Sequence, residues 1–83
     1  MYYTYIAKCN DDTLYTGITT DVIRREKEHN GTFPGGARYT RARRPVSIVY
    51  VKEFGDRATA SQEEYRIKKL TRVQKNMLIQ ETC

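Results

Sequence analysis

The sequence predicts an α+β fold: a small three-stranded antiparallel sheet with flanking helices, in the order strand, strand, helix, strand, helix, helix. Aromatic and β-branched residues, which favour strands, are concentrated at residues 2–8, 13–18 and 46–54. Turn-forming residues at positions 10–12 separate the first two segments and predict a hairpin. The segments between and after these strands begin with residues that cap helices. A length of 83 residues predicts a single domain over residues 1–83.

The first predicted helix follows the hairpin. Thr20 or Asp21 can cap its start, and Gly31 can end it after about ten residues. This helix has few apolar residues. Val22 and Ile23 are therefore its only good candidates for the hydrophobic core.

The second half of the chain contains the third strand and two more helices. The third strand is nearly continuously apolar at its centre, which predicts that both of its faces are covered. Asp56 can cap a helix over residues 57–70. Thr71 and Gln74 have the spacing of a capping box, which predicts a last helix through about residue 80.

Composition narrows the functional classes. The chain has 15 Lys and Arg against 10 Asp and Glu, and its net charge of +5 suits a polyanionic partner. No apolar run approaches the length of a membrane span and the N-terminus has no secretory signal, so we expect a cytoplasmic protein without membrane contact. Cys9 and Cys83 lack the spacing of metal ligands, and with a single His they predict reduced thiols rather than a zinc site.

Tyr5 and Tyr15 lie on the two arms of the predicted hairpin. A phenol titrates at about pH 10 and becomes a base for water only if a cation or a hydrogen bond lowers its pKa. The alternative is that both are ordinary strand residues. A two-residue turn at positions 11–12 would pair Lys8 with Tyr15 and leave Tyr5 on the opposite face. A functional pair therefore predicts an odd-length loop or a bulge.

Arg25 and His29 are four residues apart on the first predicted helix and so share one face. A guanidinium donates two parallel hydrogen bonds to a phosphate and stays charged. Asp21, four residues before Arg25, is placed to brace it. The alternative is a solvated charged face, since residues 24 and 26–28 are charged as well.

Glu64 lies on the inward stripe of the second helix, four residues after Ala60 and three before Ile67. A carboxylate there is costly unless it is paired or bound to a metal, and Mg²⁺ often uses only one or two protein carboxylates. In the competing interpretation, Ser61 and Glu64 form a capping box that starts the helix late. Its neighbour Glu63 is expected to face solvent.

Residues 31–45 are rich in glycine and proline, which predicts a loop with at most one short turn. This segment carries the densest positive charge of the chain, and no acidic residue interrupts it. Its arginines can contact phosphates while a tyrosine stacks on a base, or they can simply keep a mobile loop solvated. The candidate nucleic-acid-binding residues are Arg38, Tyr39, Arg41, Arg43 and Arg44.

In combination, these residues resemble the GIY-YIG nuclease superfamily, in particular its small single-domain bacterial branch and the Slx-type nucleases. The similarity spans about residues 3–79. Tyr3 and Thr4 stand where the first motif has Gly and Ile, and Thr16 replaces the Ile of the second, but both motif tyrosines are present. The matching elements in chain order are Tyr3-Thr4-Tyr5, Tyr15-Thr16-Gly17, Arg25, His29, residues 35–40 with 43–45, and Glu64-Tyr65.

The resemblance implies the GIY-YIG fold and a metal-dependent endonuclease that hydrolyses phosphodiester bonds. Its partner would be nucleic acid, first of all DNA, and its role structure-specific cleavage or repair. Tyr5 is then the first choice for the base, with Tyr15 in support. Arg25 would stabilise charge on the scissile phosphate, and Glu64 would bind one Mg²⁺ or Mn²⁺.

Two further residues take roles from the resemblance. His29 would hydrogen-bond a tyrosine or the phosphate, and Gly17 would let the backbone approach the site closely. Asn76 is given no role, because its surroundings do not match the family's C-terminal asparagine. The alternative functions are a catalytically weak nucleic-acid-binding module and an adaptor for a protein partner, which the sequence does not otherwise indicate.

Overall fold

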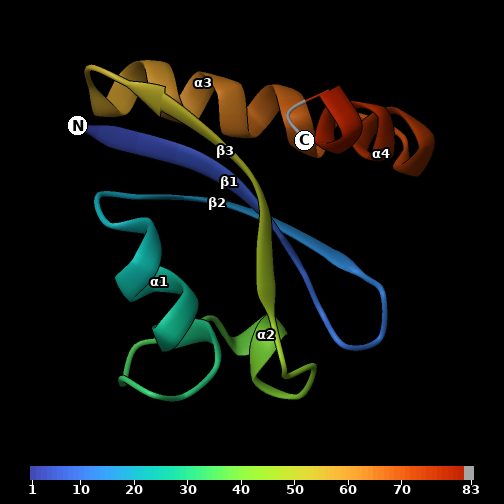
Figure 1. The fold of residues 1–83 in the computed structure, drawn as a ribbon. Coiled ribbons are helices and arrows are strands. Elements are labelled where there is room, and N and C mark those ends of the chain that lie inside the picture. Colours follow the sequence, from blue (N-terminus) through green and yellow to red (C-terminus); the bar gives the residue numbers. More distant parts are fainter. Residues whose placement is uncertain (82–83) are drawn as a thin grey trace.

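A three-stranded antiparallel sheet forms the centre of the computed structural model, which describes residues 1–81. Its strands are β1 (Tyr2–Lys8), β2 (Leu14–Thr19) and β3 (Ser47–Phe54), in the spatial order β2-β1-β3 (Figure 1). The predicted fold class and order of elements are therefore confirmed. Cys83, predicted to be a reduced thiol, lies outside the described residues.

The hairpin loop between β1 and β2 has three residues, 10–12. The Cys9 amide donates to the Thr13 carbonyl over 2.9 Å, and the Asp12 amide donates to the Cys9 carbonyl over 2.9 Å. Asp12 has a φ of 68°, the left-handed conformation that ends a three-residue hairpin loop. The loop is odd in length, as a shared face for the two tyrosines required.

The strand register follows from that loop. Tyr5 lies opposite Gly17, and Ala7 lies opposite Tyr15. Because alternate residues share a face, Tyr5 and Tyr15 project from the same side of the sheet.

Side-chain caps start three of the four helices. Asp21 accepts from the Arg24 amide over 3.0 Å, and Asp56 accepts from the Thr59 amide over 2.7 Å. Thr71 and Gln74 bond each other's backbone amides, which confirms the predicted capping box. The helices are α1 (Val22–His29), α2 (Arg38–Arg41), α3 (Arg57–Lys68) and α4 (Arg72–Glu81).

The helices cover opposite faces of the sheet: α1 and α2 lie on one side, and α3 and α4 on the other (Figure 1). Each side has its own small core. Tyr5, Ala7, Cys9 and Val46 form the first, and Ile6, Tyr50 and Ile67 form the second. The central strand β1 therefore supplies both cores through its alternating side chains. Within residues 1–81, no helix is both long and apolar enough to cross a membrane.

The segment 31–45 is a loop with one short turn, the helix α2, as predicted. Two other expectations about the fold were wrong. Ile23 is 72% exposed, and the buried residue of α1 is His29. The third strand is not covered on both faces, since β3 is an edge strand on which Val51 is 40% exposed.

Candidate active site

The Tyr5 phenol is the centre of the candidate site. Tyr5 is fully buried on the central strand. Its hydroxyl oxygen lies 2.7 Å from His29 Nε2 and accepts from Arg25 Nε over 3.2 Å. Both partners come from one face of α1, as their four-residue spacing predicted. The hydroxyl lies over Gly17, where an added Cβ would come within 2.7 Å of it.

Thr40 determines which nitrogen of His29 carries the proton. The Thr40 hydroxyl donates to the Ala37 carbonyl over 3.0 Å and lies 2.8 Å from His29 Nδ1. A hydroxyl has one proton, so towards His29 it must accept, which places the imidazole proton on Nδ1. His29 Nε2 is then the acceptor, and Tyr5 donates its proton to it.

Burial determines the protonation states of Tyr5 and His29. Desolvation raises the pKa of Tyr5 to about 12, against the opposing effect of Arg25. Desolvation and the positive charge of Arg25 lower the pKa of His29 to about 4. At neutral pH the phenol is therefore protonated and the imidazole is neutral, which is the state that the hydrogen bonds require.

Tyr15 is the more accessible of the two phenols. Its ring lies 6.4 Å from that of Tyr5, 5.4 Å from that of His29 and 5.9 Å from that of Tyr39, between ring centroids. The side chain is only partly buried. Among residues 1–81, no group hydrogen-bonds its hydroxyl, which leaves this phenol available to a ligand.

Arg25 is held by three groups. Besides Tyr5, its Nη1 donates to Glu28 over 2.9 Å and to the Gly35 carbonyl over 2.8 Å. Asp21 was expected to brace Arg25, and this was wrong because its carboxylate caps α1 instead. Sequence reasoning missed Glu28, although its spacing of three residues from Arg25 on a helix was the signal.

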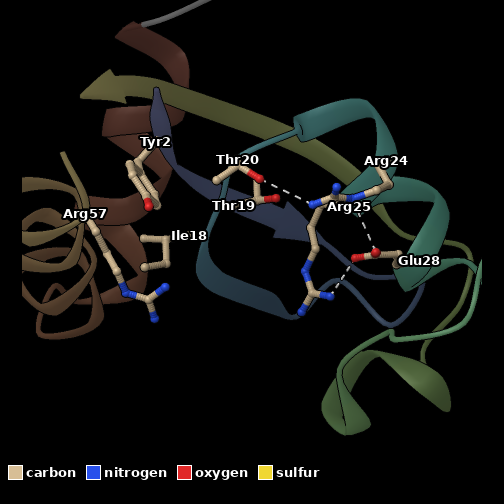
Figure 2. A pocket seen from close by; sticks show the side chains of 8 residues that line it. All are labelled: Tyr2, Ile18, Thr19, Thr20, Arg24, Arg25, Glu28 and Arg57. Carbon is tan, nitrogen blue, oxygen red and sulfur yellow. Dashed lines mark hydrogen bonds and ion pairs between the residues drawn. The ribbon is translucent and has the colours of Figure 1, made fainter. Parts of the chain in front are cut away.

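A pocket of about 250 Å³ lies next to this site, between α1 and the start of α3 (Figure 2). Arg25 is the only predicted catalytic residue that lines it. Arg24 and Glu28 join it from α1, and Arg57 from α3. The remaining lining residues are Tyr2, Ile18, Thr19 and Thr20.

Glu64 lies on α3, on the stripe that also carries the fully buried Ala60 and Ile67. Its side chain is 25% exposed, and its carboxylate lies 3.7 Å from Lys68 Nζ. The structure places Glu64 on the helix that covers the opposite face of the sheet from α1, Arg25 and His29 (Figure 1). The charge of Glu64 is the weakest of the influences on the pKa of Tyr5, after burial and the hydrogen bond and charge of Arg25. The capping-box interpretation with Ser61 was wrong, because α3 already starts at residue 57.

Glu63 was expected to face solvent, and this was also wrong. Its side chain is only 11% exposed, and it accepts two hydrogen bonds from Arg66, over 2.7 and 2.8 Å. Arg66 thereby holds the pKa of Glu63 below its usual range. Of the two adjacent carboxylates, Glu64 is the one left without a strong partner.

The donor set fits a hard divalent cation that substrate helps to bind. Within residues 1–81, no group of three or more His, Cys, Asp or Glu could hold a metal. Glu64 is a lone, partly exposed carboxylate with one long ion pair. Mg²⁺ is commonly bound by one or two carboxylates, with waters and substrate phosphates completing its shell.

The predicted nucleic-acid-binding residues divide into two kinds. Arg43 lies 3.0 Å from Asp11 and 4.1 Å over the Tyr39 ring, and Arg44 donates to the His29 carbonyl over 2.8 Å. These two side chains therefore contribute to the fold. The side chains of Arg38 and Arg41 have no ion pair or hydrogen bond within the part of the chain that the structure describes, and Tyr39 is 39% exposed.

Comparisons with known proteins place the sequence and the fold beside a known family. A family model described as the GIY-YIG catalytic domain matches residues 1–77. The UPF0213 protein DP2720 of Desulfotalea psychrophila is 51% identical over 78 residues, covering 94% of this chain and 70% of that protein. The UPF0213 protein CPE1444 of Clostridium perfringens is 51% identical over 79 residues, covering 95% of this chain and 83% of that protein. The solution NMR structure of the UPF0213 protein BH0048 from Bacillus halodurans is similar with a TM-score of 0.60 and 43% identity, covering 96% of this chain and 84% of that one.

Substitution of Gly17 tests the packing under the Tyr5 hydroxyl. We expect Gly17→Ala to lower the free energy of unfolding by about 1–3 kcal/mol, because the new methyl group must displace the phenol. Gly55→Ala is the matched control, since nothing lies within 4 Å of its added Cβ, and we expect a change of at most about 1 kcal/mol. Urea unfolding measures both. Equal effects of the two variants would contradict the close approach.

The buried, neutral His29 predicts a dependence of stability on pH. Its pKa is about 4 in the folded chain against an ordinary value of 6.5. Between these values the unfolded chain binds a proton that the folded chain does not, so stability falls as the pH drops from 6.5 to 4, by about 3 kcal/mol in total. Urea unfolding across this range measures the loss. A His29→Gln variant should lose markedly less, and an equal loss in both proteins would contradict the assignment.

Proposed function

This chain belongs to the GIY-YIG catalytic domain family, and we propose that it is a metal-dependent endonuclease that hydrolyses phosphodiester bonds in nucleic acid, chiefly in DNA. The observation that carries the proposal is the convergence of two phenols, an imidazole and a guanidinium on one face of the sheet. Glu64 supplies a partly exposed carboxylate on α3, the helix that covers the other face of the sheet. These groups can position a phosphate, activate water and bind one cation.

Tyr15 is the better candidate for the contact with water. The sequence predicted Tyr5 as the base and Tyr15 as its support. We reverse these two roles, because Tyr5 is fully buried and its hydroxyl already bonds His29 and Arg25. Tyr15 would orient the attacking water. Acting as a general base, it would accept a proton from that water.

Tyr5, His29 and Arg25 then form the support for the phosphate. His29 Nε2 accepts a hydrogen bond from the Tyr5 hydroxyl, which leaves the phenol oxygen free to accept from Arg25 Nε. With Glu28 and Gly35 on Nη1, the guanidinium has a fixed orientation before substrate arrives. A preorganised positive charge stabilises the extra negative charge of the transition state without reorganisation.

Glu64 would hold the divalent metal, Mg²⁺ or Mn²⁺. Bound there, the cation would neutralise charge developing on the leaving oxygen. The weak ion pair with Lys68 is the contact that the carboxylate would give up. Because this pair is partly exposed, giving it up costs little.

Substrate contacts beyond the scissile phosphate would come from α2. Arg38 and Arg41 have no protein partner for their guanidinium groups among residues 1–81, and Tyr39 is partly exposed beside them. These groups suit a phosphate backbone more than a base sequence. We therefore extend the proposal to a structure-specific or repair nuclease that acts in the cytoplasm.

Removal of the Glu64 charge tests the metal role. We expect Glu64→Gln to lower the rate of DNA cleavage in Mg²⁺ or Mn²⁺ by at least about 100-fold, because the metal supplies several kcal/mol of transition-state stabilisation. The matched control is Glu53→Gln on β3, where an exposed carboxylate accepts from Tyr3 over 3.2 Å. We expect this control to cleave at the wild-type rate. Equal cleavage by wild type and Glu64→Gln would sink the metal assignment.

Removing each hydroxyl in turn distinguishes the roles of the two tyrosines. We expect Tyr15→Phe to lower cleavage by about 10²–10⁴-fold and to leave stability within about 0.5 kcal/mol, since no group among the described residues hydrogen-bonds its hydroxyl. Tyr5→Phe should lower the free energy of unfolding by about 1–3 kcal/mol, because buried groups lose their partner. Cleavage rates and urea unfolding are the measurements. A fully active Tyr15→Phe variant would return the role of base to Tyr5.

A further inference from the structure

We infer that the pocket between α1 and α3 is a second phosphate subsite, in which Arg24 and Arg57 bind the phosphodiester next to the one held by Arg25 (Figure 2). The inference rests on the proposed function for the position of the scissile phosphate at Arg25. Arg24 and Arg57 are not among the residues that the sequence singled out. Their role follows only from where the fold places them.

The pocket gathers positive charge from both faces of the sheet. Although α1 and α3 cover opposite faces (Figure 1), both lie beside the end of β2, where Thr19 and Thr20 line the pocket. Arg57 reaches it from the α3 side, and Arg24 and Arg25 from the α1 side (Figure 2). Three guanidinium groups therefore border a space of about 250 Å³.

Protein groups neutralise this charge only in part. Glu28 is the one carboxylate in the lining, and it is shared between two arginines: it lies 3.4 Å from Arg24 Nε and 2.9 Å from Arg25 Nη1. The guanidinium of Arg57 has no ion pair or hydrogen bond with any residue from 1 to 81. With three arginines and one glutamate, the lining keeps two positive charges that no carboxylate of the lining neutralises, which suits an anion.

Arg25 belongs to both the candidate site and the pocket, which indicates that the anion is part of the substrate strand. Arg25 contacts the Tyr5 phenol through Nε and also lines the pocket, so the pocket begins where the scissile phosphate would be bound. In a nucleic acid strand every phosphate has neighbours one nucleotide away. A phosphate at Arg25 therefore brings the next one to the region of Arg24 and Arg57.

Two bound phosphates would fix the direction of the strand across the site. Arginine contacts to phosphates set position and orientation but carry no sequence information. The subsite would therefore align the scissile bond with Tyr15 and Glu64 for any base sequence. This gives Arg57, at the start of α3, a role in positioning the substrate.

Binding of a short fluorescein-labelled DNA single strand, with Ca²⁺ in place of Mg²⁺, tests the subsite. We expect the double variant Arg24→Gln/Arg57→Gln to bind about tenfold more weakly and to lower the slope of log affinity against log salt by about 0.7, the value of one phosphate contact on a single strand. Arg72→Gln is the matched control, because Arg72 lies on α4 and pairs with the exposed Asp12 at 3.5 Å. We expect wild-type affinity for it and wild-type urea unfolding for all variants.

Neutral methylphosphonates, placed at one phosphate at a time, identify the contact. In wild type, we expect affinity to fall when either of two adjacent phosphates is neutralised. In the double variant one of these two positions should become insensitive, and in Arg25→Gln the other should. Unchanged sensitivity at both positions in the double variant, or an unchanged salt slope, would overturn the subsite. Competition by inorganic phosphate with no sensitive position in the strand would also overturn it, because the pocket would then bind a free anion.

The same proteins separate the subsite from the proposed function. If wild type shows the two adjacent sensitive phosphates but cleaves no DNA in Mg²⁺ or Mn²⁺, the subsite stands and the nuclease proposal fails. If wild type cleaves DNA and the double variant keeps its KM and salt slope, the nuclease proposal stands and the subsite fails.

Discussion

Tyr5 carries a phenol into the layer between the sheet and α1, where the side chain has no exposure to solvent. Such a group must find its hydrogen-bond partners within the protein, and α1 supplies both through Arg25 and His29. Thr40 then fixes the imidazole proton. These contacts help to hold α1 on the sheet, Arg25 in its orientation and α2 against His29.

Local signals in the sequence predicted the fold well, because caps and turns act within a few residues. They left the length of the hairpin loop open, and it is the three-residue loop that places Tyr5 and Tyr15 on one face. The partners of charged side chains were harder to predict. Whether a glutamate pairs locally, as Glu28 and Glu63 do, or stays available, as Glu64 does, depends on packing that one-dimensional spacing does not reveal. The contact of Thr40 with His29 could not be predicted from local spacing, since it forms only when the segment after Gly31 folds back.

The candidate site is also a large part of the hydrophobic core. Among the largest fully buried side chains are Tyr5, His29 and Thr40, all of which belong to the hydrogen-bond chain. A domain of this size buries a smaller fraction of its surface than a larger domain does and has little stability to spare. Stability and the geometry of the site are therefore coupled, and loss of activity in a variant at these positions has meaning only beside its unfolding curve.

The net positive charge does not show which arginines are available to a nucleic acid. The ion pairs and hydrogen bonds of each arginine within the protein do show it. The guanidinium groups of Arg43, Arg44 and Arg66 already form ion pairs or hydrogen bonds within the fold. Among residues 1–81, the guanidinium groups without an ion pair or hydrogen bond are those of Arg38, Arg41 and Arg57. The first two lie on α2, on the same face as α1, and the third begins α3 on the other face (Figure 1). A strand that contacted all three along the β2 edge of the sheet would pass Arg25 and the pocket, which lie at that edge.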